Sequence, residues 1–523
     1  MLRINNIKAP LNSDEDYIKK KTSEKLNLSV SEISDFRIAK KSIDARNKNN
    51  IHFVYSVDCE TSSLINPSQD IEEISIEKPV EFKIKNNGIR PVVIGSGPAG
   101  MFSALALAEA GLNPIVIERG ADVDTRQKDV DIFWQLGKLN PESNVQFGEG
   151  GAGTFSDGKL MTGIKKDKFT TKVIKEFIEA GAPSEISYLA KPHIGTDNLR
   201  LVVKNIRNKI ISLGGEYHFN SKLCGLIIKD DKIQAIQVQH QNNTYEISTD
   251  KVFLAIGHSA RDTFEMLYSH GVCMTQKPFS VGLRIEHKQQ DINKSQYGKE
   301  ADNPYLGAAD YKMAVHLPNS RSVYTFCMCP GGTVVAATSE EGRVVTNGMS
   351  EFARNKENSN SALLVGVDEK DFKSKEPLAG MYFQRKLEER AFIVGGKNYH
   401  APAQLVGDFL QNKTSVKAQN VIPSYSPDVC WTNLDSVLPP EISDSLKLGI
   451  KEMGRKLKGF DCYGAVLTGV ETRSSSPVKI IRDNTMQSNI KGLYPCGEGA
   501  GYAGGITSAA VDGLKAVYSL TEE

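Results

Sequence analysis

A strand-turn-helix segment near residue 90 constrains the fold of this chain more than any other feature. Apolar residues 91–94 lead into the turn Gly95-Ser96-Gly97-Pro98-Ala99-Gly100, and residues 101–110 are alanine-rich, as in a buried helix. In such a turn the first glycine permits the tight bend, the second lets the backbone approach a ligand, and the third lets helix and strand pack closely. Because a helix N-terminus offers free N–H groups and a positive dipole end to phosphates, the segment predicts a dinucleotide site.

A second strand and an acidic residue follow at the spacing of a dinucleotide-binding βαβ unit. Residues 114–117 are apolar and predict this second strand, and Glu118 stands at its end. A carboxylate there can accept hydrogen bonds from both ribose hydroxyls of an adenosine. It disfavours a 2′-phosphorylated cofactor, because two anions would face each other. The unit therefore predicts FAD or NAD as the bound dinucleotide.

The C-terminal segment favours FAD. Residues 491–496 read as a short strand that runs into Gly497-Glu498-Gly499, and a second glycine-rich stretch precedes a helix. In many FAD enzymes a late element of this kind receives the ribityl chain and the flavin ring. Glu498 would accept a hydrogen bond from a ribityl hydroxyl. The dipole of the helix that begins at Gly505, Ile506 and Thr507 would stabilise the anionic reduced flavin.

The sequence divides into four segments. Residues 1–88 predict a small α+β module, with a strand at 2–4, a helix at 14–26 and an alternating strand at 51–57. Residues 89–271 and 460–523 carry the glycine-rich loops and predict the two parts of one FAD-binding Rossmann domain. Residues 272–459 predict an inserted mixed α+β domain for the substrate. The predicted fold class is therefore α/β with an insertion and an N-terminal module.

Composition and charge exclude several classes of protein. Lys and Arg number 64 and Asp and Glu number 63, so the net charge is +1, which makes a nucleic-acid partner an unfavoured reading. Residues 92–117 contain glycine and proline and predict strand, turn and helix rather than a membrane span. The N-terminus lacks a signal-peptide pattern, and the eight cysteines form neither a disulfide framework nor a metal site. We expect a cytoplasmic protein without a membrane partner or a metal.

Five segments of the chain, in this order, resemble a known family. They are residues 92–119, 147–160, 255–263, 327–332 and 497–499. Together they resemble bacterial FAD-dependent oxidoreductases known as NAD(FAD)-utilising dehydrogenases. The resemblance covers nearly the whole chain and implies a glutathione-reductase-type FAD-binding domain with an inserted substrate domain, but no particular reaction. It places at FAD the residues Gly95, Gly97, Pro98, Ala99, Gly100, Glu118, Arg119 and Glu498.

Several other residues are candidates for FAD binding. Arg126 offers a second positive charge near the phosphates or the ribose, or is a solvated arginine at the start of a helix. Residues 148–159 hold five glycines and can wrap the pyrophosphate and ribityl chain through main-chain N–H groups, or form a surface loop. Lys159 in this loop would raise the flavin potential if it lies near the ring. The further cofactor candidates are Gly150, Gly151, Gly153, Thr154, Gly257 and Gly497.

The catalytic residues stay open at this stage. On a regular strand Cys327 and Cys329 would project from the same face about 6.6 Å apart, which is near the upper limit for a disulfide. They are either a redox pair beside the flavin or buried structural thiols. The other candidates, as proton donors or anion clamps, are His193, Tyr399, His400, Arg284 and Arg473.

These observations predict an FAD-dependent oxidoreductase, a dehydrogenase that transfers a hydride between FAD and a small organic substrate. Because only one complete fingerprint is present, NAD(P)H or a redox protein would bind transiently as the electron partner. Two alternatives remain open. One is an RNA-modifying flavoprotein that docks RNA on its N-terminal module. The other is a non-catalytic scaffold in which FAD holds the fold together.

Overall fold

Five parallel strands form the sheet that carries the glycine fingerprint in this computed structural model, which describes residues 1–75, 78–160 and 167–521. Ile94 lies opposite both Leu254 and Ile117, and Leu254 lies opposite Pro495. The carboxyl ends of these strands therefore share one edge, and the segments that follow them meet there. The strand order is β23 (Leu493–Pro495), β11 (Val252–Leu254), β5 (Val92–Ile94), β6 (Ile115–Ile117) and β7 (Glu216–His218).

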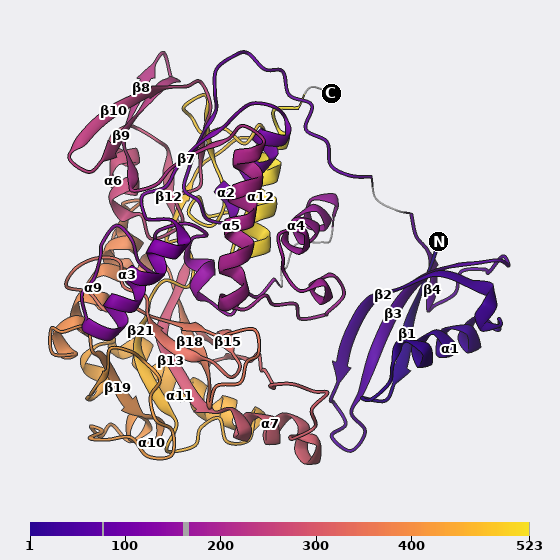
Figure 1. Ribbon diagram of the computed structural model, residues 1–523. Helices are drawn as coiled ribbons and strands as arrows, with labels where there is room; N and C mark the ends of the chain where they lie inside the picture. Colours follow the sequence, from indigo (N-terminus) through magenta and orange to yellow (C-terminus); the bar gives the residue numbers. More distant parts are fainter. Residues whose placement is uncertain (76–77, 161–166, 522–523) are drawn as a thin grey trace.

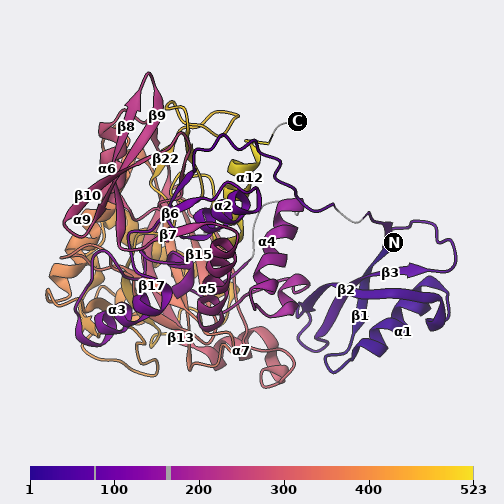
Figure 2. The same ribbon diagram turned by 45° about the horizontal axis from the view of Figure 1, so that its top comes forward.

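Apolar layers cover both faces of this sheet, because successive side chains of a strand point to opposite sides. Val93, Val116 and Phe253 pack with helices on one face, and Val92 and Ile94 pack on the other face against an antiparallel sheet. The helices α2, α5 and α12 run side by side (Figures 1 and 2). The elements of the two layers are α2 (Pro98–Glu109), α4 (Lys168–Glu179), α5 (Thr196–Ser212), α12 (Ile506–Tyr518), and β8 (Ser221–Lys229), β9 (Lys232–His240) and β10 (Asn243–Ser248).

A larger sheet of seven strands makes up the inserted part of the chain. Its central strand β13 is buried at nine of its ten residues, and helix α11 (Pro440–Lys456) packs its apolar residues into the same core. The sheet order is β14 (Ala314–His316), β15 (Ser322–Cys329), β18 (Asn358–Val367), β13 (Phe279–Lys288), β21 (Val466–Glu471), β19 (Ala401–Leu405) and β20 (Val429–Trp431).

The end of the inserted part differs from the boundary expected at residue 459. Strand β21 pairs with both β13 and β19, so the inserted sheet continues to Glu471. All six residues of β21 are buried, and a strand buried on both faces lacks the polar alternation that marks a half-buried one. An antiparallel pair, β12 (Met274–Gln276) with β22 (Val478–Ile480), joins the two ends of the insertion.

The N-terminal module is a separate antiparallel sheet of four strands with one helix. The strand order is β2 (Ile33–Asp44), β3 (His52–Thr61), β1 (Leu2–Ala9) and β4 (Ile71–Glu73), and α1 spans Glu15–Leu26. The predicted strands and helix of this module are confirmed. The module stands apart from the rest of the molecule (Figure 1). One point of attachment is the main chain of Lys41, which bonds to Tyr188 and Ala190.

The other elements connect these sheets. They are α3 (Val123–Leu136), α6 (Arg261–Ser269), α7 (Gln289–Tyr297), α8 (Glu369–Phe372), α9 (Ala379–Val394), α10 (Val406–Leu410), β16 (Thr333–Ala336) and β17 (Thr346–Met349). Within the described residues, no helix combines the length and the apolar character needed to cross a lipid bilayer. The mixed α/β architecture is the one predicted from the sequence.

Candidate functional site

A cavity of about 460 Å³ lies at the shared carboxyl edge of the parallel strands. One side, here called the glycine-rich wall, includes residues 94–99, 117–119, 146–148, 255–260 and 504–506. The opposite side, called the inserted wall, includes residues 310–312, 325–328, Asn347, Glu471, Arg473 and Ser474. The cavity therefore lies between the parallel-sheet domain and the inserted sheet.

The fingerprint turn is fixed by main-chain contacts. Gly95 has φ +97° and donates its N–H to the carbonyl of Ile117 at 2.8 Å. A Cβ at Gly100 would lie 1.9 Å from the Gly95 carbonyl oxygen, so only glycine fits there. At Gly97 a Cβ would meet nothing closer than Gly151 Cα at 3.7 Å. Gly95 and Gly100 thus shape the turn, whereas Gly97, Pro98 and Ala99 line the cavity at the uncapped N-terminus of α2.

Glu118 lines the cavity directly after β6 and organises the surrounding loops. It is 4% exposed, and its carboxylate accepts N–H groups of Ser96, Gly120 and Gly148 at 2.8, 2.9 and 3.0 Å. An ionised carboxylate offers about four acceptor positions. One position is therefore left for a hydroxyl group in the cavity.

Arg119 also lines the cavity, but its guanidinium group is already paired. It bonds to Glu142 and Asp262 at 2.8 and 2.9 Å and lies 3.9 Å from the centre of the Phe147 ring. These contacts hold the group at the end of the cavity beside Glu118. Arg119 can therefore shape the cavity and stack on a ligand, but its charge is already neutralised by two carboxylates.

Arg126 lies behind the loop of residues 148–159, here called the glycine-rich loop. It is not among the residues that line the cavity. Its side chain is fully buried and donates to the carbonyl oxygens of Asn144, Val145, Gly148, Glu149 and Gly151 at 2.7–3.3 Å. Burial lowers the pKa of this guanidinium to about 10. Arg126 therefore positions the backbone instead of offering a charge to a phosphate, because its side chain gathers five carbonyl groups of residues 144–151.

The glycine-rich loop contributes two of its four candidate residues to the cavity lining. Gly151 and Gly153 line it, whereas Gly150 and Thr154 lie behind them. A Cβ at Gly150 would be 2.1 Å from Thr154 Oγ1, so these two residues support the turn by close packing. Gly257, which follows β11, lines the cavity as well.

The C-terminal segment supplies a second helix N-terminus and a carboxyl group. Gly505 and Ile506 line the cavity at the start of α12, whose N-cap has no side-chain hydrogen bond. Thr507 donates instead to the carbonyl of Leu160 at 2.9 Å, and Gly497 packs behind the wall against Ala99. Burial raises the pKa of Glu498, which lines the cavity, to about 7, although Lys277 opposes this shift.

The inserted wall carries side chains rather than glycines. Cys327 and Met328 line it at the end of β15, where the register of β15 with β18 is interrupted. Lys159 reaches this point from the glycine-rich loop, donates to the Met328 carbonyl oxygen and pairs with Asp157 at 2.7 Å. Asp157 is held in turn by a bidentate contact with Arg354. The two walls therefore touch around Lys159.

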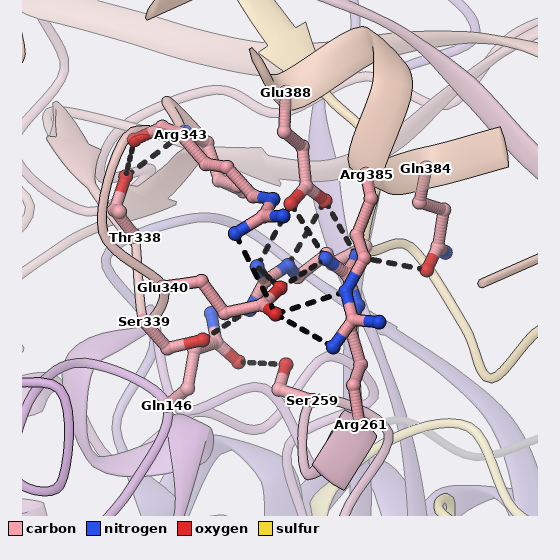
Figure 3. A network of polar contacts seen from close by, with 12 residues as sticks. Gln146, Ser259, Arg261, Thr338, Ser339, Glu340, Arg343, Gln384, Arg385 and Glu388 are labelled. Carbon is pink, nitrogen blue, oxygen red and sulfur yellow. Dashed lines mark hydrogen bonds and ion pairs between the residues drawn. The ribbon is translucent and has the colours of Figure 1, made fainter. Parts of the chain in front are cut away.

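A buried ion-pair network joins the domains beside the cavity (Figure 3). Glu388 on α9 accepts two bonds from Arg261 on α6, at 2.7 and 2.8 Å, and two from Arg473, at 2.9 and 3.1 Å. Burial opposes the charge of Glu388, but Arg261 and Arg473 overcome this effect and hold its pKa well below the usual range. Glu340 bridges Arg261 and Arg385. Because Arg473 lines the cavity, the network fixes part of the inserted wall.

Five of the catalytic candidates do not line this cavity. His193 stacks on Phe352 with ring centres 5.1 Å apart, and Tyr399 packs against Phe133. His400 follows Tyr399 at the start of β19, and Cys329 is buried directly behind Cys327. The buried Arg284 is paired with Glu471 at 2.8 Å, so it positions a residue of the inserted wall.

Other lining residues were not singled out as candidates. His258 follows Gly257 at the carboxyl end of β11, and burial lowers its pKa to about 3, so it is neutral. The sequence could have indicated His258, because it follows the glycine at the end of a buried strand. Lys191 lines the cavity from one loop, and Asp310 and Lys312 line it from another. No local pattern in the sequence marks these residues.

Comparisons with known proteins agree with this architecture. The family model of an FAD-binding domain matches residues 90–126. A second family model, described as "FAD-dependent protein, C-terminal domain-like", matches residues 278–474. The model of a domain of unknown function matches residues 1–60. A Clostridium beijerinckii protein, described only as uncharacterized, is 50% identical over 531 residues and covers 100% of this chain and 99% of its own. The chain therefore belongs to the same family of FAD-dependent proteins.

Solved structures of flavoproteins show a looser likeness. A point variant of the Escherichia coli quinol fumarate reductase is 9% identical, covers 83% of this chain and 69% of its own, and has a TM-score of 0.38. A geranylgeranyl bacteriochlorophyll reductase-like protein from Thermoplasma acidophilum is 12% identical, covers 82% and 77%, and has a TM-score of 0.36. A flavin-dependent brominase is 12% identical, covers 82% and 78%, and has a TM-score of 0.37.

The residues at the cavity fit the FAD that the family models indicate. The N-termini of α2 and α12 both reach the cavity without a side-chain cap, Gly97 leaves room for a ligand beside the first, and Glu118 keeps one acceptor position. Uncapped N–H groups and glycine turns are the features that accept a pyrophosphate. The cofactor of the protein is FAD.

Proposed function

We propose that the protein is an FAD-dependent oxidoreductase that exchanges two electrons with an organic substrate held between the glycine-rich wall and the inserted wall. The observation that carries this proposal is the continuity of one cavity from the N-terminus of α2 to the charged side chains of the inserted wall. A scaffold that merely stored FAD would have no need of a second wall with paired charges beside it.

The glycine-rich wall would hold the cofactor. The N–H groups at the start of α2 suit the pyrophosphate, and Glu118 suits the adenosine ribose. Glu498 and the N-terminus of α12 lie at another part of the same cavity and suit the ribityl chain and the ring. Bound FAD would supply the acceptance and return of two electrons.

The chain's own groups would handle the proton and the substrate. Glu498, with a pKa of about 7, can hold or release a proton near neutral pH. His258 stays neutral and so adds no charge to the cavity. Lys159 and Arg473 are fixed by Asp157 and Glu388, so their positive groups lie at defined places on either side of a substrate.

The electron partner is proposed to be NAD(P)H or a redox protein that binds transiently. The sequence carries only one complete dinucleotide fingerprint, and the FAD model covers it. A small substrate remains the proposed ligand of the inserted wall. A dehydrogenase that transfers a hydride is the reaction this arrangement suits best.

Anaerobic stopped-flow spectroscopy of the purified full-length protein tests the proposal. We expect a yellow protein with about one FAD per chain, whose absorbance is bleached by NADH, NADPH or a member of a metabolite panel. Arg473→Met should slow electron exchange between FAD and the substrate without changing the FAD content. A chain that binds FAD but is reduced by no compound would contradict the enzyme and support the scaffold. Binding of RNA at physiological salt would support the RNA-modifying alternative instead.

A further inference from the structure

Cys327 and Cys329 lie on a bulge at the end of β15. Phe326 pairs with Ala362 and Cys329 pairs with Asn360. Between these two pairs β15 advances by three residues and β18 by only two, so β15 carries one extra residue. Cys327 is the residue displaced by this extra position, and its φ of +42° is left-handed. A cysteine rarely adopts this conformation, and such outliers gather at functional sites. The regular strand expected from the sequence is therefore absent here.

The bulge gives the two thiols different surroundings. Cys327 is partly exposed and lines the cavity, whereas Cys329 is fully buried behind it. The Cys329 thiol donates to the Cys327 carbonyl oxygen at 3.3 Å, so its sulfur faces Cys327. One thiol can therefore meet a ligand while the other can meet only its partner.

Positive groups surround the pair. Lys159 donates to the carbonyl of the intervening Met328, and Arg284 Nη1 lies 3.4 Å from the Cys327 carbonyl oxygen and 4.0 Å from Cys329 Sγ. The negative neighbours, Asp157 and Glu471, are each engaged by these same cations. A hydrogen bond from Cys329, aided by Lys159 and Arg284 against the effect of burial, lowers the pKa of Cys327 to about 6. The pKa of Cys329 lies well above its usual value because it donates that bond and is buried.

Cys327 lines the same cavity as Glu498, and its charge contributes to the raised pKa of that carboxyl group. Glu498 belongs to the segment that precedes α12, and both line the cavity together with Cys327. Among the described residues no group of three or more His, Cys, Asp or Glu side chains is placed to hold a metal ion.

We propose that Cys327 and Cys329 form a redox-active dithiol that exchanges two electrons with FAD in the cavity, and that the substrate is a disulfide compound. This inference rests on the proposed oxidoreductase function and names its substrate class. Cys327 is the attacking thiolate and Cys329 is the resolving thiol.

The exchange balances as two successive displacements. The Cys327 thiolate attacks one sulfur of the substrate disulfide, a mixed disulfide forms, and the first substrate thiolate leaves. Cys329 then gives its proton to the departing second sulfur and attacks Cys327 Sγ. The products are the reduced substrate and a Cys327–Cys329 disulfide. Bound FAD in its reduced form would supply the two electrons and one proton that return this disulfide to thiol and thiolate. A nicotinamide would reduce the FAD.

Anaerobic reductive titration of the flavin-loaded protein tests the inference. After oxidation, the wild-type chain should take up twice as many electrons per FAD as Cys327→Ser or Cys329→Ser, because each variant lacks the second redox centre. Cys273→Ser removes an exposed thiol outside the cavity and should behave as wild type. Peptide mass spectrometry of the oxidised wild-type chain should show Cys327 linked to Cys329, which requires no variant to fold.

The outcomes separate this inference from the proposed function. Equal electron uptake in wild type and variants, with no linked peptide, would overturn the dithiol while leaving an FAD enzyme intact. A chain that binds no FAD, or whose FAD is reduced by nothing, would instead overturn the proposed function.

A pH profile of alkylation gives a second readout that does not depend on turnover. The rate at Cys327 should rise with a midpoint near pH 6, since the thiolate is the reacting form. Lys159→Gln should move that midpoint upward, whereas Cys273 should show no response to the Lys159 change. A Cys327 midpoint near the ordinary value of about 8.5 would contradict the assignment of the attacking thiolate.

Discussion

The two walls of the cavity are held in place by different forces. The glycine-rich wall is shaped by main-chain contacts so close that a Cβ at Gly100 would lie 1.9 Å from a carbonyl oxygen. The inserted wall is shaped by charged side chains such as Arg473, which is fixed by the buried carboxylate of Glu388. The first wall should therefore respond to added volume, and the second to lost charge.

The largest effect is expected from two glycines of the first wall. Gly100→Ala should prevent stable folding, because its Cβ meets main-chain atoms that cannot move aside. Gly97→Ala should leave the fold intact, since its Cβ has ordinary contacts only, but should weaken FAD binding by filling the space at the N-terminus of α2. Thermal melting of the flavin-free chain and a fluorescence titration with FAD measure the two effects.

Gly366→Ala is the matched control, because a Cβ there meets nothing within 4 Å. It should change neither melting nor FAD affinity. If Gly97→Ala bound FAD as tightly as the wild type, the cofactor would not approach the backbone at this turn.

The next effect concerns the charge network behind the inserted wall. Glu388→Gln leaves Arg261 and Arg473 without their shared carboxylate, and loss of one partner of a buried pair costs about 3–5 kcal/mol of unfolding free energy. Urea denaturation measures this. Glu452→Gln breaks the exposed pair with Arg455 and should cost at most about 1 kcal/mol.

The pH dependence of the network has a definite sign. The pKa of Glu388 is lowered in the folded protein, so its stabilisation is present above the unfolded value of about 4.3 and is lost as the pH falls below it. Wild type should therefore lose its advantage over Glu388→Gln in acid. An advantage that persisted unchanged at low pH would contradict the ionised pair.

A smaller effect is expected at Glu498. Its folded pKa of about 7 lies above the unfolded value, so the charged form is disfavoured and stability falls as the pH rises between the two values. Glu498→Gln should make the flavin-free chain more stable than wild type above pH 7, by at most about 3 kcal/mol. Denaturation at pH 5 and pH 8 measures the difference. An equal effect of the substitution at both pH values would show that the carboxyl group is not buried.

Parts of the glycine-rich wall carry a local signal in the sequence, because they directly follow a short strand. Glu118 follows its strand directly, and Glu498 sits beside a short strand in the same way. The position of Arg126 was not predictable, because its five carbonyl partners depend on the course of the folded chain over residues 144–151.

Most of the inserted wall could not be predicted from the sequence. Glu388 is separated from Arg261 by 127 positions and from Arg473 by 85, so no local motif records their contact. The spacing of Cys327 and Cys329 suggested one face of a strand, but the bulge that separates their surroundings depends on pairing with β18. Tyr399 and His400 looked like cavity residues only because their segment resembles a loop.

The position of FAD between the two walls is tested most directly by alkylation of Cys327 in the flavin-free and the flavin-loaded full-length chain. Peptide mass spectrometry reads the rate at Cys327, which lines the cavity, and at Cys273, which is exposed and does not. With FAD bound between the walls, alkylation of Cys327 should slow severalfold while that of Cys273 stays the same. Equal rates at Cys327 in the two forms would show that FAD binds away from the inserted wall and would contradict the account.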